Sequence, residues 1–172
     1  SPEDTTPCIA CQVQDKIGAG NAVAFDLNAA CAGFLFALHT AWAYVEAGIY
    51  RNALIVGSEV LSKIVDWEDR STCILFGDGA GAVVMEWRED ADGMLSGYME
   101  NTDDADHVLW CDSAFCDRPL PFSAASEDAA AAAAALTCDP YMRMAGQAVF
   151  KFATSAMVRC IGEALDRAGL AP

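Results

Sequence analysis

The sequence predicts an α/β protein in which helices cover a sheet of buried strands. Two short apolar runs typical of strands, 21–29 and 51–60, flank a longer apolar run typical of a helix. A strand, a helix and a second strand in close succession predict a right-handed βαβ unit. The chain has 172 residues and is 54% hydrophobic, so it is large enough to bury one core.

The first elements are predicted from their start and stop signals. A short helix is expected to begin at Thr6, which is a suitable N-cap, and to end at Gly18. The strand 21–29 follows, and a helix over 31–47 should end at Gly48. Because this second helix is apolar all round, we expect it to be buried on nearly every side.

The middle of the chain is predicted as a strand over 51–60, a polar loop over 66–72, and then a strand, a glycine turn and a strand over 73–87. The turn FGDGAG carries a pattern of spaced glycines that invites a nucleotide-binding interpretation. A strand pattern follows Gly81, so no helix N-terminus is available to hold a phosphate. We therefore expect a tight turn in which Asp78 caps local amides.

Two changes in composition mark the second half of the chain. Between 88 and 140 the hydrophobic periodicity fades into acidic and alanine-rich sequence, where Ser126 either caps a helix or lies in a low-complexity surface insertion. Order returns in a predicted amphipathic helix that Gly169 ends. Its apolar face comprises Val149, Phe150, Ala153, Met157, Cys160, Ile161, Ala164 and Leu165.

Charge and hydropathy exclude several classes of protein. The net charge is -15 and no basic stripe is present, so nucleic acid is not expected as a partner. No apolar run reaches the roughly 20 residues of a membrane span, and the first residues lack the layout of a signal peptide. We expect a cytoplasmic protein that does not bind membranes.

The eight cysteines are scattered through apolar runs, which favours reduced thiols over a disulfide framework. The pair Cys8 and Cys11 and the pair Cys111 and Cys116 together form only a weak zinc pattern. We therefore expect no metal and no cofactor. A redox or metal-binding cysteine protein is kept as an alternative.

Cys31 lies where the predicted strand meets the predicted helix. A sulfur at a helix start lies near unpaired N–H groups, whose partial positive charge stabilises a thiolate. Its own N–H could donate to an oxyanion, and small neighbours leave room for a substrate carbonyl. Those neighbours are Ala29, Ala30, Ala32 and Gly33. On this stretch alone we still favour a buried structural cysteine, because free cysteine is among the most buried residue types.

A cysteine nucleophile usually needs a base, and the chain offers two histidines. His39 lies on the same helix as Cys31, about 12 Å further along its axis at 1.5 Å per residue. His107 lies in an acidic stretch. Neither is a convincing partner, so a complete catalytic apparatus is not expected in this chain.

Three blocks of sequence, FDLNAACAGF, GSEVLSKIVDWEDRSTCILFGDGAGAVV and MAGQAVFKFA, resemble the β-ketoacyl-acyl-carrier-protein synthase III family of bacterial fatty acid synthesis. The resemblance implies a thiolase-like fold, usually dimeric. It also implies that a cysteine accepts an acyl group from acyl-CoA and that the acyl-enzyme condenses with malonyl-carrier protein, with loss of carbon dioxide. Acyl-CoA, acyl carrier protein and a second copy of the chain are the partners implied.

The resemblance also implies roles for single residues. Cys31 matches the nucleophile, and Arg70 matches an arginine that stacks on the adenine of CoA. Gly146 and Phe150 match residues lining the pantetheine tunnel, and Lys151 matches a base near the carrier-protein docking surface. Thr6 matches a position that borders the acyl pocket of the partner subunit. Together with Lys151, Arg143 and Arg159 are candidates for a basic patch that would receive the acidic carrier protein.

The resemblance implies an incomplete enzyme. We expect 1–87 to form most of the N-terminal half, 88–140 a connecting segment, and 141–172 the start of the C-terminal half. The family's catalytic histidine and asparagine have no counterpart in this chain, so the isolated chain should not catalyse condensation. Alternatives are another condensing enzyme, such as a polyketide starter synthase or a hydroxymethylglutaryl-CoA synthase, and a non-catalytic assembly piece.

Overall fold

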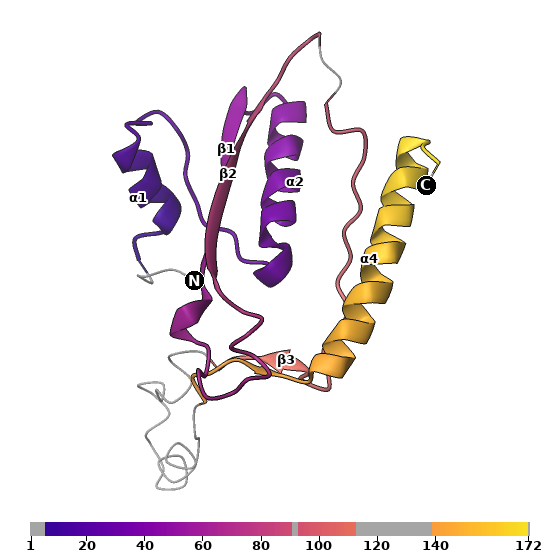
Figure 1. Cartoon of the computed structure of the whole chain (residues 1–172). Helices are drawn as coiled ribbons and strands as arrows, with labels where there is room; N and C mark the ends of the chain where they lie inside the picture. The colour runs from indigo at the N-terminus through magenta and orange to yellow at the C-terminus, as the bar shows by residue number, and fades with distance from the viewer. Residues whose placement is uncertain (1–5, 91–92, 113–138, 172) are drawn as a thin grey trace, which may run out of the picture. The chain divides into compact units, whose positions relative to one another are not determined.

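The computed structural model describes residues 6–90, 93–112 and 139–171. The helices are α1 (Ile9–Lys16), α2 (Gly33–Glu46) and α4 (Gly146–Ala168), and the strands are β1 (Asn52–Val60), β2 (Asp78–Glu86), β3 (Leu109–Trp110) and β4 (Arg143–Met144) (Figure 1). Short 3₁₀ turns cover Ala30–Ala32 and Leu61–Lys63. The predicted α/β class is confirmed. None of the described helices is long and apolar enough to span a membrane.

The chain divides into two compact units. Unit 1 comprises residues 1–60, 78–100 and 159–172, and unit 2 comprises residues 61–77 and 101–158. These units interleave along the chain, whereas the division into 1–87, 88–140 and 141–172 remains a prediction about the longer enzyme.

Unit 1 is built around a two-stranded sheet. β1 and β2 pair antiparallel, with Asn52 opposite Glu86 and Val60 opposite Asp78. α2 lies alongside the two strands (Figure 1) and contacts β1 more extensively than β2. The small core between them contains the buried residues Ala41, Val45 and Ile55.

The predicted strand over 21–29 is wrong for the described structure. The run begins in a turn and belongs to no strand, so the described residues form no βαβ unit, and the sheet of unit 1 is antiparallel. A strand requires a paired neighbour, and no described strand pairs with this run. Side chains hold it instead: Gln14 Nε2 donates to the carbonyl of Ala22 at 2.7 Å.

The glycine-rich segment also differs from its prediction. Residues 73–77 form turns and coil where a strand was expected, and Asp78 begins β2. The capping role of its side chain stays a prediction. Gly81 lies in the interior of β2, opposite Gly57 of β1. A Cβ atom on Gly57 would lie 3.4 Å from Cδ2 of Phe34 on α2. The absence of a side chain at Gly57 therefore lets α2 approach the sheet closely.

The prediction that the second helix is buried on nearly every side is wrong within this chain. Only Ala41 and Val45 of α2 are buried, and Leu35 is 58% exposed. The described residues cover one face of the helix and leave its other apolar side chains accessible. α4 likewise has exposed apolar side chains; Phe150, for example, is 71% exposed.

The helix ends follow the prediction better than the helix starts. Gly18, Gly48 and Gly169 follow α1, α2 and α4 with φ of 71°, 68° and 69°, which is the left-handed conformation expected of a C-terminal glycine. The start of α1 differs, since the helix begins at Ile9 and not at Thr6.

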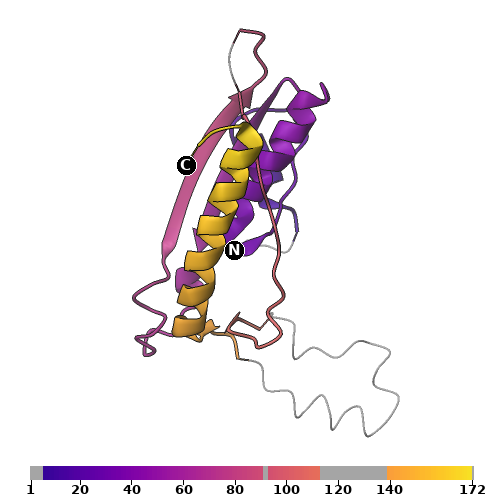
Figure 2. The same ribbon diagram turned by 90° about the vertical axis from the view of Figure 1, so that its right-hand side faces the viewer.

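Unit 2 combines a compact loop with the short β3–β4 ladder. Val65 and Thr72 are its most buried side chains, and both come from the loop 61–77. The backbone N–H of Met142 donates to Ile64 at 2.8 Å, which ties β4 to this loop. α4 is one continuous helix (Figure 2), and its residues 146–158 belong to unit 2. The helix predicted after Ser126 lies outside the described residues.

Candidate active site

Cys31 lies in a sharp turn that leads directly into α2. The residue before it, Ala30, has φ of 45°, in the left-handed region that an alanine rarely adopts. The side chain of Asn28 holds this conformation, because its Oδ1 accepts the N–H of Ala30 at 3.0 Å. Backbone strain of this kind persists only where the surroundings enforce it, and it concentrates at functional sites.

The turn presents the thiol to solvent. Cys31 is exposed, and Gly33 begins α2 two residues later. Ala32, the N-cap of α2, makes no side-chain cap, and the N–H groups of Ala32 and Gly33 donate to the carbonyls of Ala29 and Ala30. The helix dipole still places partial positive charge at this end of α2. The described residues therefore do not bury Cys31 as a structural cysteine would require.

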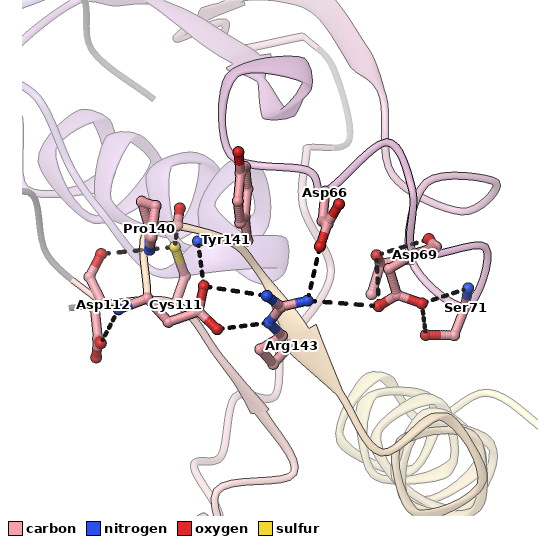
Figure 3. Close-up of polar contacts among 10 residues, drawn as sticks. Asp66, Asp69, Ser71, Cys111, Asp112, Pro140, Tyr141 and Arg143 are labelled. Atoms are coloured by element: carbon pink, nitrogen blue, oxygen red, sulfur yellow. Dashed lines mark hydrogen bonds and ion pairs between the residues drawn. The ribbon is translucent and has the colours of Figure 1, made fainter. Parts of the chain in front are cut away.

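A second cluster of polar residues lies in unit 2 around Arg143 (Figure 3). The guanidinium donates through Nε to Asp139 at 2.6 Å and through one terminal nitrogen, Nη1, to Asp66 at 3.0 Å. The same Nη1 lies 4.0 Å from a carboxylate oxygen of Asp69. Arg143 therefore joins β4 to the loop that contains Asp66, Asp69 and Arg70.

Hydrogen bonds in this cluster shift the pKa values of its charged groups toward the ionised forms. Hydrogen bonds from Arg143 hold the pKa of Asp139 below its ordinary value. The hydroxyl and N–H of Ser71 lower the pKa of Asp69, with a smaller contribution from Arg143. Hydrogen bonds to Asp139 and Asp66 raise the pKa of Arg143. At neutral pH the cluster holds a cation among carboxylates, as an anchor requires.

Buried packing supports the same loop. Thr72 is fully buried, and its hydroxyl lies 3.2 Å from both the carbonyl and a carboxylate oxygen of Asp69. Arg70 stands exposed between Asp69 and Ser71, whose side chains hydrogen bond to each other at 2.6 Å. The loop is therefore fixed on both sides of Arg70, while the arginine itself remains available to solvent.

Comparison with known proteins places this geometry in a family. The family of 3-oxoacyl-[acyl-carrier-protein (ACP)] synthase III matches residues 25–103. The β-ketoacyl-[acyl-carrier-protein] synthase III of Clostridium acetobutylicum is 43% identical over 170 residues, which make up 99% of this chain and 49% of that protein. This chain belongs to the β-ketoacyl-[acyl-carrier-protein] synthase III family. It spans about half the length of the curated relatives that it matches.

Solved structures of the family confirm the thiolase-like fold expected from the resemblance. The structure of the synthase III from Thermus thermophilus matches with a TM-score of 0.82 and 35% identity, over 100% of this chain and 49% of that one. The synthase III from Aquifex aeolicus matches with a TM-score of 0.81 and 37% identity, over 99% and 47% of the two chains.

The residues predicted from the family fall into both units. Cys31 and Thr6 belong to unit 1, where Thr6 is exposed just ahead of α1. The other four belong to unit 2, where the Arg143 cluster ties the Arg70 loop to the strand that precedes α4. These four are Arg70, Gly146, Phe150 and Lys151.

The first two turns of α4 contain its three predicted residues. Gly146 and Phe150 are four residues apart and therefore lie on the same face, and Lys151 lies next to it. A Cβ atom on Gly146 would lie 3.5 Å from Cε of Met144, so this position is close to its neighbour without being crowded. Phe150 and Lys151 are both exposed.

The expected basic patch is smaller than predicted. Arg143 is held by the carboxylates described above, and Arg159 pairs with Glu100 through Nε at 2.9 Å. That pairing raises the pKa of Arg159 and lowers that of Glu100. Lys151 forms no ion pair with a described residue, so it is the cation of the three that stays available.

Sequence reasoning missed the two features that hold the site. One sequence feature could have indicated the left-handed Ala30. Asn28 lies two residues before it, and an asparagine in this position often hydrogen bonds to the backbone of a turn. The contact between Arg143 and Asp66 leaves none in local sequence, because the two residues are separated by 77 positions.

Proposed function

We propose that the longer enzyme containing this chain is a β-ketoacyl-[acyl-carrier-protein] synthase III that uses Cys31 as its acyl acceptor. It would start fatty acid synthesis by joining an acyl group from acyl-CoA to a malonyl group on the carrier protein. The observation that carries this proposal is the exposed Cys31 in a strained turn that leads directly into α2. Family membership supplies the reaction class.

In the first half-reaction the Cys31 thiolate attacks the thioester carbon of acyl-CoA. The carbonyl oxygen takes up the negative charge, and N–H groups at the start of α2 are suited to stabilise it. The C–S bond to CoA then breaks, CoA leaves as a thiolate that takes a proton from solvent, and the acyl group remains on Cys31. Small residues around Cys31 leave space for this approach.

In the second half-reaction the malonyl group loses carbon dioxide, and the resulting carbanion attacks the acyl carbon on Cys31. The C–S bond breaks, the Cys31 thiolate is released, and the new carbon–carbon bond gives a β-ketoacyl product. This step needs groups that polarise the malonyl thioester. His39 is not proposed for this role, because its ring packs 5.6 Å from the ring of Trp42 and directly against Gly97.

We therefore expect the isolated chain to catalyse no condensation. His107, the other histidine, is exposed in a turn of unit 2. The test is a malonyl-dependent condensation assay on the purified chain, with the Clostridium acetobutylicum relative as the positive control. Turnover close to that of the control would contradict this part of the proposal.

The unit 2 residues are proposed to bind the CoA portion. Arg70 presents a planar cation that can stack on an adenine ring, and the buried Thr72 and the Arg143 cluster hold its loop in place. Gly146 and Phe150 would line the path of the pantetheine arm. Thr6 would border the acyl pocket of a second subunit in a homodimer of the longer enzyme.

Lys151 is proposed to contact the acidic carrier protein. It is exposed, and within the described residues it is not neutralised by a carboxylate. In the longer enzyme, Lys151→Glu should raise KM for malonyl-carrier protein by about tenfold and leave KM for acyl-CoA within about twofold, because one reversed contact costs 1–2 kcal/mol. Equal effects on both substrates would contradict a docking role. Lys16→Glu, at an exposed lysine of α1 in unit 1, is the matched charge-reversal control.

A further inference from the structure

Two further cysteines of unit 1, Cys8 and Cys11, lie close together and apart from the acyl acceptor Cys31. We propose that Cys8 and Cys11 form an oxidisable dithiol, which a small-molecule disulfide converts into an intramolecular disulfide. The two Sγ atoms lie 3.1 Å apart. Cys11 is exposed and Cys8 is half-buried, so a small reagent can reach the pair.

The fold holds these two thiols against each other. Cys8 immediately precedes α1 and Cys11 lies in its first turn, so the spacing of three places both on one face of the helix. The carboxylate of Asp26 accepts the N–H groups of Ile9 at 2.9 Å and Ala10 at 2.8 Å, which fixes the backbone between the two cysteines. The pair is thus anchored by a residue far away in sequence.

A further contact restrains the second thiol. Cys11 Sγ lies 3.7 Å from the carbonyl of Ala24, as a weak hydrogen bond. A disulfide bond is about 2.05 Å long, so the sulfurs need to approach by only about 1 Å to be joined. The folded chain therefore places the two thiols in an arrangement from which a disulfide forms with little movement.

The oxidation balances as two successive exchange steps. One protein thiol loses its proton, and its thiolate attacks the small disulfide; the S–S bond of the reagent breaks, and one small thiol leaves. The other protein thiol then loses its proton and attacks the mixed disulfide, releasing the second small thiol. The protein loses two electrons and two protons, and the reagent gains them as two thiols.

A metal explains this pair less well than oxidation does. Zinc in proteins takes four ligands in structural sites and three protein ligands in catalytic sites. Across the described residues, no group of three or more His, Cys, Asp or Glu side chains is placed to hold a metal ion. The carboxylate of Asp26 is occupied with the two amides of α1.

Trypsin provides a direct readout, because peptide 1–16 contains Cys8 and Cys11 and no other cysteine, while peptide 17–51 contains only Cys31. The folded chain is equilibrated with mixtures of oxidised and reduced glutathione, quenched with acid, alkylated and digested. We expect peptide 1–16 to lose the mass of two hydrogens and to escape alkylation. Its glutathione adduct should stay at least about tenfold less abundant than its disulfide, because the second exchange is intramolecular.

The Cys8→Ser and Cys11→Ser variants are the matched controls. Each should convert peptide 1–16 from the disulfide to the glutathione adduct, while circular dichroism reports that the helices remain. The proposal is overturned if peptide 1–16 of the folded wild-type chain is still alkylated at both cysteines under conditions where peptide 17–51 is modified. It is also overturned if the main product is a glutathione adduct on peptide 1–16.

Discussion

Two helices of unit 1 begin beside a cysteine, and the two starts are built differently. At α1 the carboxylate of Asp26 occupies the first N–H groups, and the Cys8 and Cys11 thiols contact each other. At α2, among the described residues, no carboxylate accepts the first N–H groups; the amide oxygen of Asn28 holds the strained Ala30, and Cys31 is exposed. One helix start is filled, whereas the other is open.

This difference shows which cysteine suits acyl transfer. An acyl acceptor needs an accessible sulfur and an N–H group for the developing oxyanion. The start of α2 offers the exposed Cys31; because Ala32 and Gly33 use their N–H groups within the turn, the N–H of Cys31 is the candidate for the oxyanion. At α1 a negative charge already takes the first N–H groups, and the hydrogen bond between the thiols raises the pKa of Cys11. A cysteine at a helix start is therefore not suited to acyl transfer by its position alone. The groups that contact that helix start decide whether it can accept an acyl group.

The largest expected effect comes from removing the sulfur at the open helix start. In the longer enzyme, Cys31→Ala should lower the rate of condensation by at least about a thousandfold, as expected for loss of a nucleophile. Cys11→Ser, at the filled start, should change the rate by less than about twofold. A steady-state assay with acetyl-CoA and malonyl-carrier protein measures both variants. Comparable losses in the two variants would remove the distinction between the helix starts.

An intermediate effect is expected from the strained residue before the nucleophile. Ala30→Val should lower the free energy of unfolding by about 1–3 kcal/mol, because a β-branched side chain tolerates a positive φ poorly. Ala30→Gly should stay within about 1 kcal/mol of the wild type or stabilise it, since glycine adopts this φ without strain. Urea unfolding followed by circular dichroism measures both. If the valine variant is as stable as the glycine variant, the backbone at residue 30 is not strained.

The smallest effect concerns pH at the filled helix start. The hydrogen bond from Cys8 raises the pKa of Cys11, so the folded chain keeps this proton at a pH where the unfolded chain loses it. Stability should therefore fall as pH rises from the ordinary thiol pKa toward the raised value. Unfolding measured over a series of alkaline buffers should show this slope in the wild type and a shallower one in Cys11→Ser.

A matched substitution elsewhere controls for the loss of any thiol. Cys73→Ser lies in unit 2 and leaves both helix starts intact, so it should keep the alkaline slope. An unchanged slope in Cys11→Ser would show that the thiol pair does not hold the extra proton.

The helices and their glycine stops could be predicted because their signals are local. The apolar run of α2 and the glycine at 48 lie within one stretch of chain, and the structure contains both as expected. Paired strands could not be predicted with the same success. The run over 21–29 has strand composition, but pairing depends on a neighbour that local sequence does not specify.

The candidate site was predicted only in part for the same reason. Cys31 could be found because the strand-to-helix junction and the family blocks are local patterns. The anchor around Arg143 joins side chains distant in sequence, and the carboxylate that fills the start of α1 comes from Asp26. Neither contact can be predicted from local sequence, so the sequence does not distinguish the filled helix start from the open one.

The most direct test of the account is to map where acetyl-CoA acetylates the chain. The purified chain is incubated with acetyl-CoA, quenched in acid and digested with trypsin, and the peptides are identified by mass spectrometry. The account predicts an acetyl group on Cys31 in peptide 17–51 and none on peptide 1–16. Acetyl groups on Cys8, Cys11 or other cysteines, with Cys31 always unmodified, would contradict it.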